Sequence, residues 1–415
     1  MGERRRAVIT GLGAVTPIGL GVSLFWSAAL AGKNGVSTIT NFDTQGHAVT
    51  IAGEIKDFDP GDWMDPKEAK RVDRFTQFSI AASEEAVRDS GVDFGSIDPY
   101  RVGVIIGTGI GGIVEMEAQV TRLNKGGPSR VSPFLIPKLM PNAAAGNVAI
   151  RYGVHGPNMD ITTACASASH AIGEAVLTIR SGRADIVITG GTEAALTSVG
   201  VAGFANMKAL TSTHNDDPEN ASRPFDKDRD GFVMGEGAGG LILEEYEHAR
   251  KRGARIYAEV AGYSATCDAH HITAPDPGGE VAAKTMQLAL DDAHLTRDHV
   301  SYINTHSPAT RYGDAMECAA IKRLFGERAS QPPVSGLKSM VGHLLGASGA
   351  VAAIATALSI QEGKVHPTVN YCTPDPDCDV DCVPNEAREM NVSVALSNAF
   401  GFGGHNASLV ITEVE

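Results

Sequence analysis

One cysteine lies where an apolar strand gives way to a long helix of small residues. Residues 161–163 suit a strand, and residues 165–179 are mostly small or apolar, as in a buried helix that stops at Ser181. At a helix start, unpaired backbone N–H groups and the positive end of the helix dipole favour a thiolate over a thiol. We therefore predict that Cys165 lies in or near the first helical turn and is a nucleophile, rather than a small core residue.

Two histidines in the second half of the chain follow strands in a similar way. His306 ends a short strand, and Glu317 lies early in the next helix. Residues 334–360 repeat the order of strand, small residues, reactive side chain and long alanine-rich helix, with His343 where the first half has Cys165. A duplicated chain brings both helix starts toward one centre, and the three side chains are expected to meet there.

One thiolate and two histidines together fit carbon–carbon bond formation on thioesters. The cysteine takes an acyl group, and decarboxylation of a malonyl thioester gives an enolate whose oxygen needs two hydrogen-bond donors. Neutral imidazoles can supply both N–H groups, and a helix start disfavours the imidazolium form of His343. A cysteine–histidine protease would need one histidine, oriented by an Asn or Asp.

The elements expected around these residues predict an α/β fold with buried sheets. Short apolar strands alternate with longer helices, and the chain of 415 residues is 43% apolar, enough for a large core. The polar run at residues 246–254 is a plausible seam. We therefore expect an N-terminal half at residues 1–253, with Cys165, and a C-terminal half at residues 254–415, with both histidines.

Charge and cysteine content exclude several classes of function. The formal net charge of −14 argues against nucleic-acid and membrane-surface binding. The six cysteines have no regular spacing, which indicates a reducing, cytoplasmic setting rather than a disulfide framework. Three of them alternate with aspartates at residues 372–382, but the spacing fits no standard zinc site, and we predict a solvated acidic loop without a metal.

Two further patterns allow competing interpretations. Residues 107–112 match the G-x-G-x-x-G fingerprint of dinucleotide-binding folds, but Glu115 and Glu117 follow where a pyrophosphate would lie, so a loop lining a cavity is favoured. A helix expected within residues 65–87 carries a basic cluster of Lys67, Lys70, Arg71 and Arg74. The cluster is either a solvated helix face or a docking site for an acidic partner.

Longer motifs make the whole chain resemble the β-ketoacyl-[acyl-carrier-protein] synthases of the elongating, type II kind, members of the thiolase-like superfamily. The motifs are TTACASASHAIGEA around Cys165, the NTH of His306, KSMVGHLLGASGA around His343, and RPFDKDRDGFVMGEGAG and NAFGFGGHNASL elsewhere. The resemblance implies a thiolase-like fold in which two duplicated halves form a layered α-β-α-β-α sandwich.

The resemblance also implies roles for individual residues. Cys165 is then the acyl-accepting nucleophile, and His306 and His343 support decarboxylation of the malonyl group. Lys338 orders the site with Glu317 as its partner. Phe402 gates the acyl pocket, and its backbone N–H forms an oxyanion hole with that of Cys165. The other residues implied in substrate binding are Ile110, Phe134, Phe204, Thr310, Phe400 and Gly401.

The implied partner is acyl carrier protein, an acidic protein whose phosphopantetheine arm carries the substrates. The basic residues implied in docking it are Lys67, Lys70, Arg71 and Lys208, and the enzyme itself is implied to be a homodimer without a cofactor of its own. One departure concerns residues 307–310, Ser-Pro-Ala-Thr, where the family usually has Gly-Thr-x-Thr. Thr310 remains, but Pro308 offers pantetheine neither a hydroxyl nor an N–H.

Three alternative functions remain open at this stage. A non-condensing partner subunit of the same fold, similar to chain-length-determining proteins, would not need Cys165 together with both histidines. A degradative thiolase would need a second cysteine near the C-terminal glycine-rich loop, which the chain lacks. An oxidoreductase would rest on residues 107–112 alone.

Overall fold

The chain folds around one mixed sheet of eleven strands. The structure is a computed structural model and describes residues 4–328 and 331–414. The strands of the sheet are β1 (Ala7–Thr16), β2 (Gly19–Leu20), β5 (Val102–Gly107), β6 (Asn158–Ile161), β7 (Ile186–Glu193), β8 (Gly237–Glu245), β9 (Ala258–Cys267), β10 (Tyr302–Asn304), β11 (Val334–Ser335), β14 (Val394–Gly401) and β15 (His405–Thr412).

The strand order shows the internal duplication directly. The first half of the sheet has the order β6-β5-β7-β8-β1, and the second half has the order β11-β10-β14-β15-β9. In each half, the first two pairings are parallel and the next two are antiparallel. An antiparallel pairing of β1 with β9 joins the halves. The expected boundary at residues 253 and 254 falls between α9 (Tyr246–Lys251) and β9.

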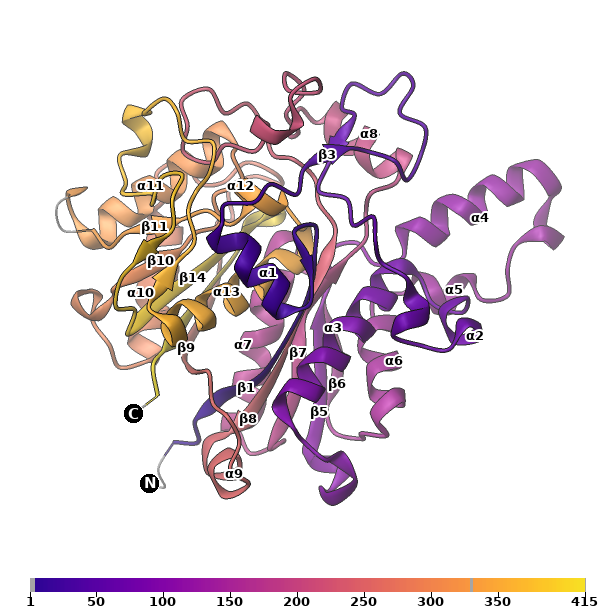
Figure 1. Cartoon of the computed structure of the whole chain (residues 1–415), viewed down its shortest axis with the longest axis horizontal. Helices are drawn as coiled ribbons and strands as arrows, with labels where there is room; N and C mark the ends of the chain where they lie inside the picture. The colour runs from indigo at the N-terminus through magenta and orange to yellow at the C-terminus, as the bar shows by residue number, and fades with distance from the viewer. Residues whose placement is uncertain (1–3, 329–330, 415) are drawn as a thin grey trace.

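Helices cover both faces of each half-sheet and complete five layers (Figure 1). The central layer is α7 (Ser167–Arg180) and α13 (Ser348–Glu362), which contact each other and strands of both halves. The outer layers are α3 (Arg74–Ser90) with α6 (Ala143–Tyr152) on the first half, and α10 (Glu280–Asp292) with α11 (Arg311–Phe325) on the second. The predicted layered α-β-α-β-α sandwich is confirmed.

Small residues allow the two central helices to lie in contact. A Cβ on Gly349 of α13 would lie 2.3 Å from the Oγ atom of Ser169 in α7, so only glycine fits at this crossing. Both helices are buried along most of their length, which explains their lack of a polar face. Their first turns consequently lie side by side in the middle of the molecule.

Matching turns precede the two central helices. The 3-10 turn η5 (Ala164–Ala166) leads into α7, and the 3-10 turn η9 (Leu345–Ala347) leads into α13. Each turn begins with a non-glycine residue at positive φ, 51° at Ala164 and 46° at Leu345. The counterpart of Cys165 is therefore Gly346, and the prediction that His343 holds that position is wrong. The connection before this turn contains a short helix that sequence periodicity did not reveal, α12 (Lys338–Val341), and His343 lies between α12 and the turn.

Two local predictions need correction. The single helix expected within residues 65–87 is two helices, α2 (Pro66–Ala69) and α3, because Asp73 leaves the helical conformation and caps α3 by accepting the Phe75 N–H. The loop at residues 372–382 is not fully solvated. Cys378 and Cys382 are buried in the core beneath α11, and of the cysteines in this loop Cys372 alone is exposed.

An arm projects from the first half, at the right of Figure 1. It consists of α4 (Ile113–Gly126), the 3-10 turn η4 (Pro128–Arg130) and α5 (Leu135–Leu139). In α4 the buried side chains are polar, whereas Met116, Val120 and Leu123 are exposed. Strand β6, on the same half, is the open edge of the sheet. The arm thus presents exposed apolar side chains, and the same half of the fold has an unpaired strand edge.

The remaining helices and strands are short. They are β3 (Ser37–Thr38), β4 (Ile51–Ala52), β12 (Lys364–Val365), β13 (Arg388–Glu389), α1 (Val22–Leu30) and α8 (Ser198–Asn206). Within the described residues, no helix has both the length and the apolar character needed to cross a membrane.

Candidate active site

Cys165 lies in a strained turn between β6 and α7. Ala164 has a φ of 51°, a conformation that side chains other than glycine rarely adopt. The Ser167 hydroxyl holds the turn closed: it accepts the Thr163 N–H at 2.9 Å and donates to the Ala164 carbonyl at 2.6 Å. The turn directs Cys165 toward the second half of the fold, where η9 and the end of β14 contact it.

Burial decides the protonation state of this cysteine. Only 9% of Cys165 is exposed, and loss of water raises the pKa of its thiol to about 12. The Lys338 ammonium and the Phe402 backbone N–H, which donates to Sγ, act in the opposite direction but do not compensate. The prediction of a resting thiolate is therefore wrong for this closed site. The cysteine rests as a thiol and must release its proton when it attacks.

His306 lies two residues after the end of β10, and a buried carboxylate fixes its backbone. The two carboxylate oxygens of Glu317 accept the N–H groups of His306 at 3.0 Å and of Ser307 at 2.8 Å. Asn398 donates to the same carboxylate at 3.2 Å. Lys338 donates to the His306 carbonyl. The backbone of His306 is thus held on both sides by charged groups.

His343 is fixed from the other direction, by its neighbours in the turn before α13. Its backbone N–H donates to the Val233 carbonyl at 2.7 Å. The Leu345 N–H donates to Nδ1 at 3.2 Å, and the Ser348 hydroxyl lies 2.9 Å from the same atom. Because Nδ1 accepts a hydrogen bond, the ring hydrogen of the neutral imidazole is on Nε2.

The two imidazoles form a neutral pair. Their ring centroids lie 5.3 Å apart, with an angle of 83° between the rings. Burial, followed by the charge of Lys338, lowers the pKa of both His306 and His343 well below the usual value. The expectation of neutral rings agrees with this geometry, but the main cause is burial rather than a helix start.

Lys338 connects the cysteine to the histidines. Its charge acts on the Cys165 thiol and on both rings, which places the four groups in one cluster. Burial lowers the pKa of Lys338 and raises that of Glu317. In the described part of the chain no direct ion pair joins Lys338 to Glu317. They hold adjacent backbone groups of the His306 segment instead.

Aromatic residues close the cluster. The Phe400 ring lies 6.0 Å from that of His306, and the Phe204 ring lies 6.4 Å from that of Phe402. Ile110 and Phe204 pack against the apolar group that contains Cys165. At Gly401, a Cβ would lie 3.1 Å from the backbone nitrogen of Cys165, which explains the glycine.

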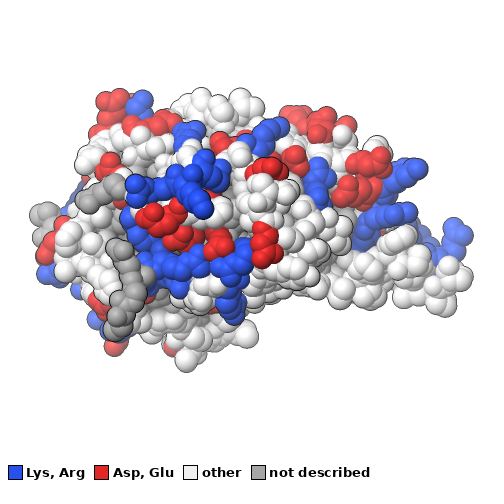
Figure 2. All heavy atoms as spheres, turned by 90° about the horizontal axis from the view of Figure 1, so that it is seen from below, with Lys and Arg blue, Asp and Glu red and all other residues white. Residues whose placement is uncertain are grey.

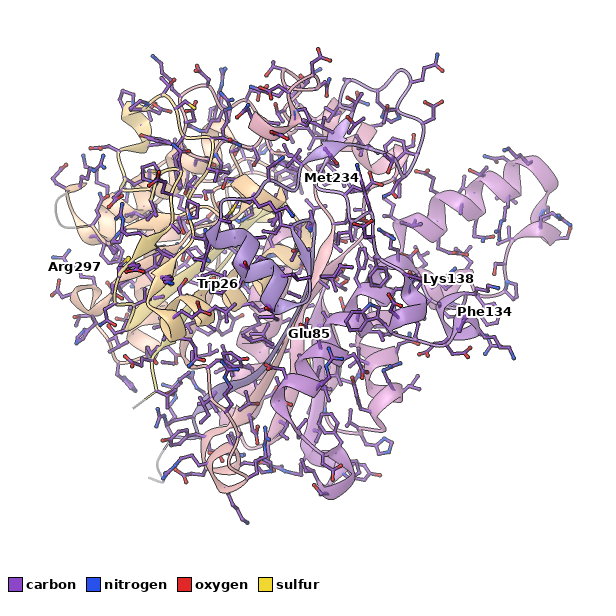
Figure 3. The ribbon with its side chains drawn as sticks, viewed as in Figure 1. Trp26, Glu85, Phe134, Lys138, Met234 and Arg297 are labelled. Atoms are coloured by element: carbon purple, nitrogen blue, oxygen red, sulfur yellow. The ribbon has the colours of Figure 1, made fainter. Side chains whose placement is uncertain are left out.

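Two residues implied in substrate binding have other contacts within the chain. The Thr310 hydroxyl accepts the Gly313 N–H at 3.1 Å and caps α11, while the adjacent Ala309 has a φ of 72°. Phe134 is 44% exposed on the arm, where the Arg71 guanidinium lies 5.7 Å from its ring centre. Figure 3 shows Phe134 far from Met234, whose backbone bridges to His343. The chain therefore does not bring its own Phe134 to the cluster.

The basic residues implied in docking are exposed but divide between two places. Lys67, Lys70 and Arg71 lie on and after α2, beside α5, whereas Lys208 follows α8 in another part of Figure 1. Figure 2 shows further Lys and Arg side chains along the projecting arm. None of the four docking residues forms an ion pair with a described residue. The three basic residues at α2 therefore lie beside the arm, and Lys208 lies apart from them.

Sequence reasoning missed three residues of the site. The Phe232 ring lies 5.1 Å from that of His343, Asn398 holds Glu317, and Glu193 is fully buried close to Cys165. Glu193 had a detectable signal, since it is a lone charge in the small-residue run GGTEAA directly after an apolar strand. The other two had none, because Phe and Asn are ordinary residues in such loops.

Comparison with known proteins agrees with this geometry. Residues 4–249 match the family model "Beta-ketoacyl synthase, N-terminal domain", and residues 257–372 match "Beta-ketoacyl synthase, C-terminal domain". The 3-oxoacyl-[acyl-carrier-protein] synthase 2 of Synechocystis sp. is 51% identical over 413 residues, covering 100% of this chain and 99% of the relative. The protein of the same name from Staphylococcus aureus is 51% identical over 415 residues, with 100% of both chains covered.

Solved structures give the same result. The ishigamide ketosynthase/chain length factor has a TM-score of 0.94 and 36% identity, with 100% of both chains covered. A type II ketosynthase in complex with its acyl carrier protein has a TM-score of 0.93 and 37% identity, again with 100% of both chains covered. The resemblance found in the motifs is confirmed, and the chain belongs to the β-ketoacyl synthase family.

Proposed function

We propose that the chain elongates acyl groups by decarboxylative Claisen condensation with malonyl-acyl-carrier protein. The observation that carries this proposal is the neutral pair of His306 and His343 beside a buried cysteine whose sulfur accepts the Phe402 N–H. The named activity of the Synechocystis and Staphylococcus aureus relatives supports it.

In the first half-reaction, Cys165 takes the acyl group from the pantetheine sulfur of the carrier. Its sulfur attacks the thioester carbonyl, and the N–H groups of Cys165 and Phe402 stabilise the oxyanion. The carbon–sulfur bond to pantetheine then breaks, and the cysteine proton passes to the departing sulfur. The exchange leaves no net charge in the buried site, which suits a cysteine that rests as a thiol.

In the second half-reaction, malonyl-carrier protein loses carbon dioxide and forms an enolate. The Nε2–H of His343 and the ring of His306 stabilise the enolate oxygen, because each neutral imidazole can donate one N–H. The enolate carbon attacks the Cys165 thioester, and the sulfur leaves to recover a proton. Every step is a substitution, a decarboxylation or a proton transfer, and the proposal calls for no cofactor held by the enzyme.

The reaction is tested by incubating the protein with acyl-carrier protein and malonyl-carrier protein and weighing the carrier-bound products. Formation of 3-oxoacyl-carrier protein, two carbons longer than the donor, supports the proposal. Transfer without elongation, or no reaction at all, contradicts it and favours the non-condensing partner subunit. The presence of Cys165 with both histidines in one cluster argues for elongation.

The patch of Lys67, Lys70 and Arg71 is the proposed docking site for acyl carrier protein, with Lys208 as a separate contact. The related ketosynthase solved in complex with its carrier protein supports this partner. A local basic patch on an acidic enzyme raises the association rate of an acidic partner. These side chains are exposed and free to make new ion pairs.

Reversing two charges of this patch is expected to weaken carrier docking. For Lys70→Glu with Arg71→Glu, we expect KM for carrier-bound substrates to rise about tenfold at low salt, with less effect at high salt. Acylation of Cys165 by a small thioester without a carrier should be unchanged. Lys251→Glu, an exposed lysine on α9, is the matched control. An unchanged KM for the double variant would remove the patch from the docking site.

We also propose that two chains form a homodimer through the arm and β6. The exposed apolar side chains of α4 and the open edge of β6 support this interface, because large uncovered apolar patches mark association surfaces. Phe134, which lies outside its own cluster, would then be available to the neighbouring subunit.

The free cysteines of the described chain favour a cytoplasmic setting.

A charge on the arm is expected to separate such a dimer. In sedimentation velocity, the wild-type protein should sediment as a dimer and Val120→Glu largely as a monomer, because burying an unpaired carboxylate at an interface is costly. Leu24→Glu, on the exposed face of α1, is the matched control and should remain dimeric. A monomeric wild type at micromolar concentration would contradict the proposal.

A further inference from the structure

Glu193 is a fully buried carboxylate at the end of β7 with four hydrogen-bond donors and no cation among them. Its Oε1 atom accepts the Thr108 hydroxyl at 3.1 Å and the Ile110 N–H at 3.2 Å. Its Oε2 atom accepts the Gly109 N–H at 2.8 Å and the Gly346 N–H at 2.9 Å. A charge buried in this way is retained only where the surrounding donors are fixed.

These donors belong to segments that are far apart in the sequence. Three come from the loop after β5, which carries Ile110, and the fourth is Gly346 in η9, the counterpart of the Cys165 turn. The loop and the turn touch so closely that a Cβ on Gly346 would lie 2.2 Å from the Gly109 nitrogen. The Glu193 carboxylate thus joins the loop beside the acyl pocket, in the first half, to the turn beside His343, in the second half.

The joined segments act directly on the reacting groups. Leu345, next to Gly346, donates the hydrogen bond that places the ring hydrogen of His343 on Nε2. Ile110 packs in the apolar group around Cys165. A movement of Gly346 or of the Gly109 loop would therefore change the direction of the His343 donor and the wall of the acyl pocket together.

We propose that ionised Glu193 is a positioning residue for condensation, which holds the acyl-pocket loop and the His343 turn in one fixed arrangement. The inference rests on the proposed function of the site. Glu193 touches no substrate in this role and acts through Ile110 and Leu345. The negative charge of Glu193 is required. In Glu193→Gln, the N–H₂ group of the amide would face two of the four donors, and in a protonated Glu193 the O–H would face them.

The titration of Glu193 gives the proposal a specific signature. Burial raises the pKa of Glu193 to about 7. The charged and titratable groups facing it are Asp160 on β6 and the Cys165 thiol. Because the raised pKa means that the proton binds below about pH 7, the positioning is complete above that pH and is lost as the pH falls through it.

The test measures condensation by the full-length protein between pH 5.5 and 9, with acyl- and malonyl-carrier protein as substrates. For Glu193→Gln at alkaline pH, we expect kcat to fall roughly 10- to 100-fold and KM for malonyl-carrier protein to change less than about threefold. Thr108→Ala removes one donor, so the acid limb of the pH profile should move upward by about half a pH unit. Burial raises the pKa of Asp160 to about 7 as well, so Asp160 is a second candidate for the limb. Asp160→Asn removes its charge and should move a limb set by Glu193 downward, whereas a limb set by Asp160 itself would disappear.

Glu317 provides the competing explanation of an acid limb, since burial also raises its pKa to about 7. Thr108 bonds to Glu193 and not to Glu317, so a limb set by Glu317 would stay in place in Thr108→Ala. In the Glu193→Gln background, Thr108→Ala should have no further effect on the limb. An immobile limb in Thr108→Ala, or wild-type kcat in Glu193→Gln, overturns the proposal.

Two measurements separate this result from other failures. If Glu193→Gln does not fold, as judged by thermal unfolding, Thr108→Ala and Asp160→Asn still decide the outcome through their opposite shifts. If the wild-type protein does not condense at all, the proposed function fails. The positioning role then fails as well. A different outcome is a wild-type protein that condenses and whose acid limb does not move in Thr108→Ala, which overturns the positioning role alone.

Discussion

Cys165→Ala is expected to abolish acyl transfer and condensation while retaining decarboxylation of malonyl-carrier protein. Removal of a covalent nucleophile costs roughly 10⁴-fold or more in rate, because no other group in the site can hold the acyl chain. Decarboxylation needs only the two histidine donors, which the substitution leaves in place. If both outcomes are observed, acyl transfer is assigned to Cys165 and decarboxylation to the two histidines.

Intact mass spectrometry provides the measurement. After exposure to acyl-carrier protein, the wild-type protein should gain the mass of one acyl group and the variant none, while both release carbon dioxide from malonyl-carrier protein. Cys372→Ala is the matched control, because Cys372 is exposed and lies outside the cluster. An acyl adduct that persists in Cys165→Ala, or disappears in Cys372→Ala, would assign the nucleophile elsewhere.

The fold could be predicted well because its signals are local and repeated. Apolar strands and small-residue helices recur in both halves, and a duplicated α/β chain has few ways to bury two helices without a polar face. The register of the duplication could not be predicted. The short helix α12 lies in the connection before His343, and the matching φ values of Ala164 and Leu345 identify the equivalent turns only in the structure.

The reactive side chains of the site could be predicted from the sequence, but their burial and pKa values could not. Cysteine and histidine residues at strand ends can be found in a sequence, but the depth of burial cannot. Proximity to a helix start predicted a thiolate at Cys165, whereas exclusion of water raises its pKa to about 12. Glu193 stands out in the sequence as a lone charge among small residues, but the backbone donors that hold it have no sequence signature, so its role could not be predicted.

The second large effect on condensation is expected from the replacement of either buried histidine. His306→Ala and His343→Ala are each expected to lower condensation roughly 10²- to 10⁴-fold while Cys165 still becomes acylated, because the enolate oxygen loses one of two donors. The double variant should lose less than the product of the single effects, since one donor alone cannot hold the enolate in place. Rates come from product mass, and acylation from the mass of the protein.

Substitution by asparagine tests the donor role more closely than alanine does. His343→Asn keeps an N–H donor near the position of the imidazole and should recover part of the activity lost in His343→Ala. The control is His366→Asn, a fully buried histidine bonded to Tyr302 and Ser335, which should affect stability more than condensation. Equal loss in His343→Asn and His343→Ala would indicate that the ring acts by shape or as a base.

The pH dependence gives an independent check on the same pair. Both pKa values lie well below the usual value, so the rings stay neutral and keep their donors throughout the range in which an ordinary histidine titrates. An acid limb near neutral pH in the wild type then comes from groups other than the two rings and should survive in His343→Asn. If that limb instead disappeared with the histidine, His343 would carry a proton at rest, and the enolate would be stabilised by a charge rather than by two neutral donors.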